Sequence, residues 1–405
     1  MKRFKCFSWV LGSCFFMTMS VMAQQHTINV FAMDRDALAI NKKKIQSGDK
    51  QLMPALEKLI KTADQLLEQP VYTVMEKKQT PPSGDRHDYM SLALYYWPDP
   101  SKSDGLPYIR KDGQINPEVN DFKDKANIGE MCKMVEQLSL AYYFTEDSKY
   151  AQKTIDQLKA WFLNKDTRMN PNFNFAQAIK GKNDGRGIGI IESRNFINVV
   201  DATGIIQSSK LWTKTDQVGM EEWFGDFLKW LMTSKNGIEE YQTKNNHGIW
   251  YDAQKLSFAL FTHKDEIAQS TLKSIKSRLE DQMDTTGFFP AEMERTISLH
   301  YSAFIMEPLF MIANMSATMG DNLWVYSSPS GRSLKKAFNT LMPYLSKEKE
   351  WTWQQIKTFD YSGNASPLLA QGFYKYNCKT CRERIYSIYQ KNPDESILHL
   401  TTLID

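Results

Sequence analysis

The chain has 405 residues, of which 42% are hydrophobic, 12% aromatic and 24% charged. This composition provides enough apolar surface for a large packed core and excludes a mostly disordered chain. The charged fraction, together with a mean hydropathy of −0.49, also excludes a polytopic membrane protein.

Residues 1–23 are typical of a secretory signal peptide. Three bases within the first five residues precede an apolar run over residues 7–22, and Ala23 ends a stretch typical of a cleavage site. The run is short for a membrane span, and its continuation past Cys14 disfavours a lipoprotein anchor at that residue. We therefore expect a periplasmic or secreted protein with no membrane span after cleavage.

Cleavage would leave a chain without net charge. The formal charge of +3 comes entirely from the three bases of the signal peptide, so 47 bases and 47 acids remain. Such a protein has no global field that would attract nucleic acid or an anionic membrane, and neither is an expected partner. Attraction for any polyanion has to come from a local cluster of bases.

No residues have the full spacing of a metal site. Of the cysteines left after cleavage, Cys132, Cys378 and Cys381, the last two have the spacing of half a zinc site. Neither a second pair nor a nearby histidine cluster completes that site. We expect a local disulfide or two thiols near a helix start, and no metal or other cofactor, although a structural calcium ion in the loops stays open.

Helical periodicity dominates the rest of the chain, and continuous β alternation is scarce. Consecutive helical hairpins in this number close into a toroid or stack as a solenoid, and the lack of a fixed-period repeat disfavours the solenoid. We therefore predict an all-α fold, an (α/α) toroid, as a single domain over residues 24–405. The helical stripes cover residues 52–63, 131–144, 151–162, 196–208, 220–232, 249–261, 267–283, 299–319 and 334–345.

Two long segments lack a helical pattern. Residues 72–125 contain six prolines, and residues 164–191 contain one proline and four glycines. Long irregular loops in a compact domain are more often functional than accidental. We expect both segments to lie over a groove at the mouth of the toroid.

Two short motifs carry candidate chemistry. Asn245, Asn246 and His247 precede an apolar helical segment; either asparagine could cap that helix, but capping does not account for the histidine. About fifty residues later, Arg295 precedes Tyr301 by six positions. Taken alone, the arginine could pair with a nearby glutamate, Glu292 or Glu294, and the tyrosine could belong to the core. The two motifs together are more informative than either one.

The two motifs resemble the active-site motifs of the alginate-lyase superfamily, whose members are polysaccharide lyases with a helical toroid fold. Residues 91–100 and 105–113 resemble the amino-terminal signature of that superfamily, and residues 192–196 resemble one of its inner-helix motifs. The resemblance covers roughly residues 85–310. The spacing from the arginine to the tyrosine is one residue shorter than in the better-known alginate lyases.

The resemblance implies β-elimination on a 1,4-linked uronate polymer, either alginate, especially mannuronate-containing alginate, or glucuronan. The C5 proton is hard to remove next to an ionised carboxylate, so Asn246, His247 and Arg295 would neutralise that group. Tyr301 would act as base and acid where the C5 proton and C4 oxygen share a face, as in β-mannuronate and β-glucuronate. In α-guluronate they lie on opposite faces, and His247 would be the base.

The protonation state of Tyr301 stays open at this point. Tyrosine ordinarily ionises near pH ~10, so ionisation near pH ~7 requires a shift of about three units, or roughly 4 kcal/mol, from neighbouring positive charge. Arg295 is the nearest candidate for that charge. A tyrosine that stays neutral until the substrate binds is equally compatible with the pattern.

Further residues are candidates for binding neighbouring sugars of an acidic polysaccharide. Arg194 and Asn195 could bind a second carboxylate, although Arg194 could instead pair with Glu192. Aromatic side chains stack on sugar rings through their apolar faces, but ordinary core packing explains them as well. The candidates of this kind are Tyr95, Tyr96, Trp97 and Trp250, and His300 lies beside the proposed catalytic tyrosine.

Two other functions fit parts of the pattern. A glycoside hydrolase on the same kind of toroid would need two carboxylates flanking the bond, for which Asp252, Glu292 and Glu294 are candidates. A secreted glycan-binding protein without catalysis would need the aromatic groove but not the Asn-His and Arg…Tyr set. Removal of the Tyr301 hydroxyl would abolish turnover by a lyase and barely affect a binding protein.

Overall fold

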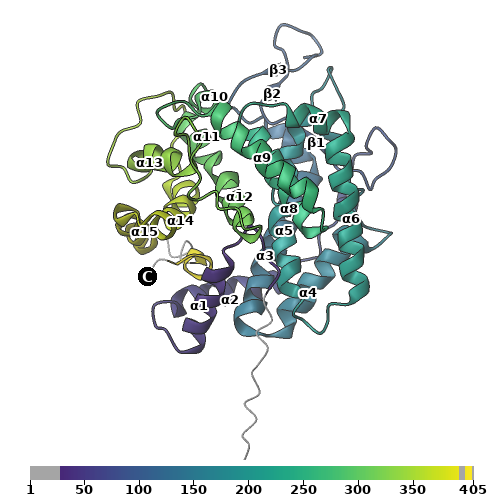
Figure 1. Ribbon diagram of the computed structural model, residues 1–405. Helices are drawn as coiled ribbons and strands as arrows, with labels where there is room; N and C mark the ends of the chain where they lie inside the picture. The colour runs from purple at the N-terminus through teal and green to yellow at the C-terminus, as the bar shows by residue number, and fades with distance from the viewer. Residues whose placement is uncertain (1–27, 392–396, 404–405) are drawn as a thin grey trace, which may run out of the picture.

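The computed structural model describes residues 28–391 and 397–403, so the expected signal peptide lies outside the described residues. Most of the described chain is helical (Figure 1). No helix in these described ranges is both long enough and apolar enough to cross a membrane.

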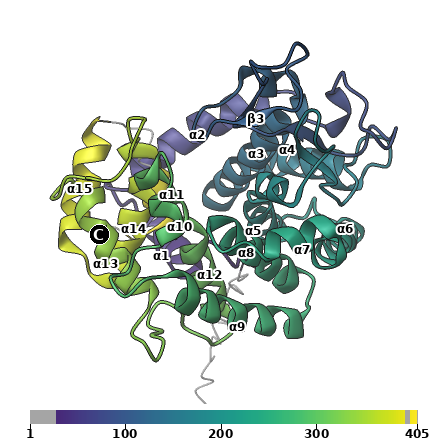
Figure 2. The same cartoon turned by 90° about the horizontal axis from the view of Figure 1, so that it is seen from above.

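The long helices form an inner and an outer ring, which Figure 2 shows from above. The inner helices contact one another in chain order, and each outer helix packs against at least one of them. The inner ring consists of α3 (Lys123–Thr145), α5 (Phe196–Ile206), α8 (Asn246–Phe261), α12 (Met306–Thr318) and α14 (Ser366–Tyr376). The outer ring consists of α2 (Met53–Leu67), α4 (Ser148–Leu158), α6 (Lys214–Thr233), α9 (Asp265–Gln282), α13 (Leu334–Leu345) and α15 (Lys379–Lys391). This is the (α/α) toroid predicted from the sequence.

Burial explains which helices lie inside. All residues of α5 except Asn198 are buried, because this helix is apolar on every side and is covered on every side. The outer helix α4 is amphipathic and buries one face, which includes Tyr150, Ile155 and Leu158. The core of the molecule therefore lies between the two rings.

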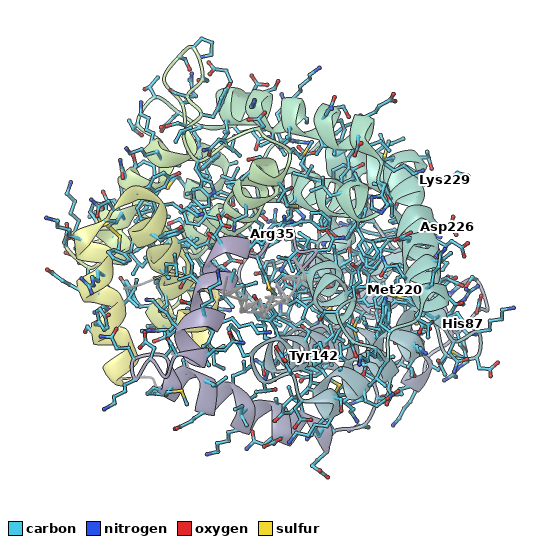
Figure 3. All side chains as sticks on the ribbon, turned by 60° about the horizontal axis from the view of Figure 1, so that its bottom comes forward. Arg35, His87, Tyr142, Met220, Asp226 and Lys229 are labelled. Atoms are coloured by element: carbon cyan, nitrogen blue, oxygen red, sulfur yellow. A yellow bond between two sulfur atoms is a disulfide. The ribbon has the colours of Figure 1, made fainter. Side chains whose placement is uncertain are left out.

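The N-terminal region closes the ring. α1 (Arg35–Gln46) contacts the short C-terminal helix α16 (Leu398–Thr401), which in turn contacts α2. Figure 3, in which the bottom of the molecule comes forward, shows Arg35 at the start of α1 near the centre of the ring. The buried carboxylate of Asp201 on α5 accepts hydrogen bonds from the backbone N–H groups of Phe31 (2.7 Å) and Met33 (2.6 Å). These bonds fix the segment before α1 against the inner ring.

Short elements form the opposite end of the toroid, at the top of Figure 1. The two irregular segments meet there, because β1 pairs in parallel with β4. β2 and β3 form an antiparallel pair in which Tyr96 lies opposite Arg110. The strands are β1 (Met90–Leu92), β2 (Tyr96–Trp97), β3 (Ile109–Arg110) and β4 (Phe175–Ala178). The short helices and single turns are α7 (Lys235–Tyr241), α10 (Pro290–Met293), α11 (Ser298–Phe304), η1 (Val74–Glu76), η2 (Pro117–Asp121), η3 (Lys159–Leu163), η4 (Gly187–Ser193) and η5 (Tyr361–Ala365).

One predicted helix is divided in two. The apolar stripe over residues 299–319 forms α11 and α12, which are separated at Ile305. Pro308 has no backbone N–H with which to bond the carbonyl of Phe304, and this breaks the helical ladder at the division. The break separates the part of the stripe that carries Tyr301 from the inner-ring helix.

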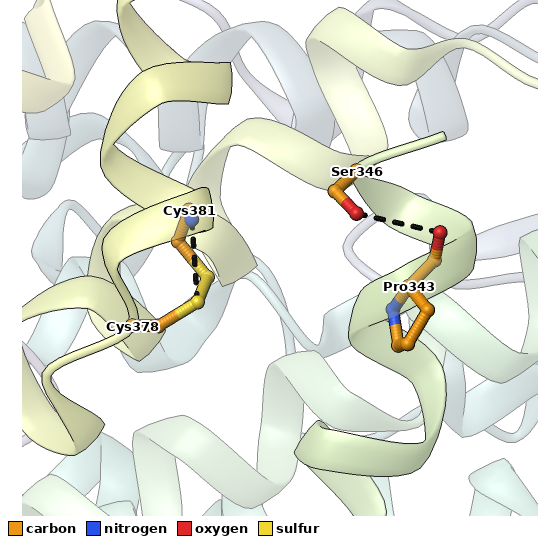
Figure 4. The surroundings of a disulfide bond; sticks show 4 residues. All are labelled: Pro343, Ser346, Cys378 and Cys381. Atoms are coloured by element: carbon orange, nitrogen blue, oxygen red, sulfur yellow. Dashed lines mark hydrogen bonds between the residues drawn. A yellow bond between two sulfur atoms is a disulfide. The ribbon is translucent and has the colours of Figure 1, made fainter. Parts of the chain in front are cut away.

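Cys378 and Cys381 form a disulfide at the start of α15 (Figure 4). A local disulfide was one of the two states that the sequence left open. Cys132 is a free, buried thiol on α3.

Candidate active site

A pocket of about 460 Å³ lies at the end of the toroid that carries β2, β3, α7 and α11. The first irregular segment contributes Tyr95, Tyr96 and Arg110 to its lining, and the second contributes Arg186. Asn246 and His247 line it from the first turn of α8. The two irregular segments thus cover the mouth of the toroid, as their proline and glycine content predicted.

Tyr301 lines the same pocket from α11 and is only 7% exposed. Its hydroxyl lies 3.0 Å from that of Tyr95, and the guanidinium carbon of Arg295 lies 3.6 Å from the centre of its ring. Burial raises the pKa of Tyr301 and outweighs the Arg295 charge, which lowers it; the hydrogen bond with Tyr95 raises it further. Burial and the contact with Tyr95 thus favour a neutral phenol in the free protein, which is one of the two states that the sequence left open.

Arg295 is held against Tyr301 by Asp112. The arginine donates two hydrogen bonds to this carboxylate, from Nη2 (2.8 Å) and from Nε (3.2 Å). Burial would raise the pKa of Asp112, but the hydrogen bonds and charge of Arg295 lower it to about 2. The ion pair with Glu292 or Glu294 that the sequence suggested is therefore wrong, and a residue of the β3 loop takes that place.

Asn246 is fully buried and bonded to Glu292. Its backbone N–H donates to Glu292 Oε1 (2.6 Å), and its side-chain nitrogen donates to Oε1 (3.0 Å) and Oε2 (2.8 Å). Its Oδ1 has no hydrogen-bond partner within the described part of the chain. Burial raises the pKa of Glu292, although the hydrogen bonds from Asn246 lower it. The carboxyl group bonded to this amide thus gains a proton at a higher pH than a free glutamate does.

His247 is oriented by a buried carboxylate on α7. Its Nδ1 lies 2.8 Å from Oε1 of Glu240, a fully buried residue. When the Glu240 carboxylate accepts a hydrogen bond from Nδ1–H, Nε2 is the ring nitrogen that remains for a ligand. Asn245 caps α8 by accepting the His247 backbone N–H (3.0 Å), so the first asparagine is the cap and the next two residues line the pocket.

Comparison with known proteins decides the family. A sequence model described as alginate lyase matches residues 73–351. The chain belongs to the alginate lyase family. The structure is similar to that of an alginate lyase from Bacteroides ovatus, with a TM-score of 0.85, 38% sequence identity, and coverage of 92% of this chain and 99% of the other. Comparison with curated proteins finds no match.

Two more distant alginate lyase structures share the fold. Alginate lyase A1-III from Sphingomonas species A1 has a TM-score of 0.58 and 17% identity, over 88% of this chain and 92% of that one. A histidine-to-alanine variant of A1-III complexed with a tetrasaccharide has a TM-score of 0.57 and 16% identity, over 88% and 91% of the two chains. The family membership and the similarity to the Bacteroides ovatus enzyme make this alginate lyase family member a polysaccharide lyase.

Three of the residues predicted to bind neighbouring sugars in this lyase do not line the pocket. Trp250 is only 2% exposed and packs in the core against Phe304, so its faces are not available to a sugar. Trp97 donates its indole N–H to the carbonyl of Gln114 (3.0 Å) outside the pocket. Asn195 lies at the N-cap of α5 and is likewise outside the lining. The burial of Trp250 contradicts the prediction that it stacks on a sugar, whereas sugar binding by Trp97 and Asn195 stays a prediction.

The other predicted residues line the pocket of the lyase. Tyr95, Tyr96, His300 and Arg194 are all part of its wall. Arg194 is not paired with Glu192, since that carboxylate instead accepts hydrogen bonds from Tyr89 (2.8 Å) and Ser91 (2.5 Å). The Arg194 guanidinium lies over the rings of Phe304 and Trp250, at 5.5 and 5.9 Å.

The carboxylates proposed for a hydrolase are placed elsewhere. Asp252 is fully buried in an ion pair with Arg278 (2.7 Å), and Glu294 is exposed outside the pocket. Glu307 is the one acidic residue among the described residues that line the pocket, so no pair of carboxylates flanks it. Over residues 28–391 and 397–403, no three His, Cys, Asp or Glu side chains are grouped as a metal site.

Proposed function

We propose that the enzyme cleaves a 1,4-linked uronate polymer by β-elimination, with mannuronate-containing alginate or glucuronan as substrate. The observation that carries the proposal is the meeting of Asn246, His247, Arg295 and Tyr301 in one pocket. The related structures are those of alginate lyases, which supports the same class of substrate.

The charge of the pocket supports an acidic substrate. Four arginines line it, from both irregular segments and from the turns before α5 and α11, whereas the mature chain as a whole is close to neutral. A cleft lined by one sign of charge raises the local concentration of an oppositely charged ligand. The four are Arg110, Arg186, Arg194 and Arg295.

Arg295 and Asn246 would neutralise the carboxylate of the sugar that loses its C5 proton. As the amide stands, Glu292 takes its donors and leaves Oδ1 unpaired in the buried wall of the pocket. If Glu292 takes up a proton, it can donate to Oδ1 after the amide turns over, and the amide nitrogen then donates to the substrate. The raised pKa of Glu292 favours this protonated state. Preorganised donors of this kind stabilise the charge that builds up on the carboxylate.

Proton transfer would involve Tyr301 and His247. A base removes the C5 proton, the C4–C5 double bond forms, the C4–oxygen bond breaks, and an acid protonates the departing oxygen. Neutral Tyr301 can supply the final proton, and the free Nε2 of His247 can accept the first, which suits α-guluronate. For β-mannuronate or β-glucuronate, Tyr301 first has to lose its own proton to solvent on substrate binding, and the Arg295 cation on its ring favours that loss.

The experiment that tests the proposed function is incubation with purified polymannuronate, polyguluronate and glucuronan. Elimination creates an unsaturated end that absorbs ultraviolet light, so absorbance should rise with at least one polymer. Hydrolysis would instead release reducing ends without that absorbance. If every polymer stays intact, the substrate assignment is wrong.

We further propose that the protein acts in the periplasm or outside the cell. The expected signal peptide motivates this location, and the Cys378–Cys381 disulfide supports it because disulfides persist in oxidising compartments. Mass spectrometry of the protein recovered from the producing cells should find an N-terminus near residue 24. An intact N-terminus at Met1 would contradict the proposal.

A further inference from the structure

Glu307 is the one carboxyl group among the described lining residues of a pocket that is otherwise basic. It lies in the first turn of α12 and is partly buried. Its side chain has no hydrogen-bond or ion-pair partner in the described part of the chain, and the described mechanism does not use it. A carboxylate left alone in a site for polyanions would oppose binding, so its presence calls for a function.

Glu307, Arg194, His300 and Phe304 belong to the same pocket lining, and we call these four residues the floor of the pocket. The His300 ring stacks on Phe304, with their centres 6.0 Å apart and an interplanar angle of 8°. Arg194 lies over the same Phe304 ring, and its Nη1 donates to the carbonyl of Ile191 (3.2 Å). No carboxylate within the described residues forms an ion pair with Arg194. The side chains of Arg194 and Glu307 are therefore both available to bind a ligand.

The titratable groups near Glu307 come from three elements. Arg194 precedes α5 and its charge acts on Glu307, His300 belongs to α11, and Glu136 of α3 acts, like Arg194, on the thiol of Cys132. Glu136 is not part of the pocket lining. Burial raises the pKa of Glu307 to about 7, although the Arg194 charge lowers it. A neutral carboxyl group, unlike a carboxylate, can donate a hydrogen bond to an anion.

Arg194 and Glu307 are not among the groups assigned to the reacting carboxylate. Glu307 lies on α12 and Tyr301 on α11, and the two helices are divided at Ile305. The carboxylate beside the C5 proton has to lie close to Arg295 and Asn246, which neutralise it in the proposed mechanism. A carboxylate bound by Arg194 and Glu307 therefore belongs to another sugar of the substrate.

We propose that Arg194 and Glu307 form a second carboxylate-binding subsite, in which Arg194 supplies the positive charge and protonated Glu307 donates a hydrogen bond to the same carboxylate. The ligand is the carboxylate of a uronate next to the one that is cleaved, so this inference rests on the proposed function. The subsite makes Glu307 a specificity-determining residue that favours a polymer with consecutive acidic sugars over one in which neutral sugars alternate.

The subsite predicts that substrate binding takes up a proton. Below the pKa of free Glu307 the donor is already present, and above it the group has to be protonated as the ligand binds. Affinity should therefore fall as pH rises above about 7, by up to tenfold per pH unit. Since Glu307 is proposed to bind a sugar other than the one that is cleaved, the effect should appear in KM and not in kcat.

Calorimetry measures the proton directly. An oligouronate of mannuronate is titrated into the Tyr301→Phe protein at about pH 8, in two buffers of different ionisation enthalpy. We expect Glu307 to account for the uptake of about one proton per ligand. Adding Glu307→Gln, which keeps a neutral donor, should lower the total uptake by that amount. Adding Glu136→Gln instead is the matched control, because burial also raises the pKa of Glu136 to about 7 and the residue lies outside the lining.

Steady-state kinetics of Glu307 variants with Tyr301 intact provides a second test of the subsite. Glu307→Gln should keep kcat and remove the rise of KM above about pH 7, whereas Glu307→Ala should raise KM at every pH. Equal proton uptake with and without Glu307→Gln, or an unchanged pH dependence of KM, would overturn the subsite while leaving the lyase intact. Failure of the unaltered enzyme to cleave any uronan would instead overturn the proposed function.

Discussion

The hydroxyl groups of Tyr95 and Tyr301 lie 3.0 Å apart, although the two residues are 206 positions apart in the chain. The bond joins the first irregular segment to α11 and places a second phenol next to the proposed proton-transfer group. Tyr95 was predicted to stack on a sugar, and in the free protein its hydroxyl is instead directed at Tyr301. This contact gives Tyr95 a direct influence on the proton of its neighbour.

Tyr95→Phe should shift the pH dependence of mannuronate cleavage toward lower pH. The hydrogen bond with Tyr95 raises the pKa of Tyr301, so its removal should lower that pKa and form the phenolate at lower pH. Rates measured against pH check this, with Tyr96→Phe as the control because Tyr96 lines the same pocket without contacting the Tyr301 hydroxyl. A shift toward higher pH would contradict the assigned direction.

Asp112→Asn should weaken both catalysis and the stability of the protein above about pH 4. The substitution removes the charge that holds Arg295 over the Tyr301 ring, and a misplaced catalytic group costs about 10²-fold in rate. Because the folded-state pKa of Asp112 is about 2, its contribution to stability is present above pH ~4 and is lost as pH falls toward 2.

Urea unfolding at several pH values tests the stability part of this prediction. The difference between Asp112→Asn and the unchanged protein should shrink as pH falls from about 5 to about 2. A difference that grows over this range would show that the ion pair with Arg295 does not cause the effect. Asp104→Asn is a suitable control, since Asp104 is exposed and has no contact with Arg295.

Glu292→Gln should keep much of the activity, whereas Glu292→Ala should lose about 10²-fold. The glutamine can accept the Asn246 backbone N–H and donate to its unpaired Oδ1, which turns the amide nitrogen toward the substrate. Alanine leaves the buried amide without a partner. Values of kcat and KM for both variants check this, and equal losses in the two would argue against a role for the proton on Glu292.

Glu240→Gln should impair guluronate cleavage more than mannuronate cleavage. The Glu240 carboxylate fixes the tautomer of His247, and this histidine is the proposed base only for guluronate. We expect the ratio of the two activities to change by roughly 10²-fold. Glu239→Gln is the control, because Glu239 bonds the Gly187 backbone and not the histidine. Equal losses on both polymers would contradict this division of roles.

Local patterns predicted the toroid, and the resemblance of two short motifs to the alginate-lyase superfamily indicated the four candidate residues that line one pocket. The stripes of α5 and α8 show their apolar faces directly, and Asn246 and His247 are adjacent. By contrast, Glu240 contacts His247, and Asp112 contacts Arg295, only after separate elements have packed together. No spacing in the sequence therefore predicts these two carboxylates. Trp250 was assigned wrongly because its aromatic character fits a core and a sugar site equally well.

The most direct test of the central claim compares binding and turnover in Tyr301→Phe. This variant keeps the ring under Arg295 and loses only the hydroxyl that would transfer the proton. Tyr251→Phe is the matched control, since it removes a buried hydroxyl that bonds the Leu231 carbonyl away from the pocket. We predict that Tyr301→Phe binds an oligouronate normally and forms no unsaturated product, while Tyr251→Phe keeps its turnover. Near-normal turnover by Tyr301→Phe would contradict the account.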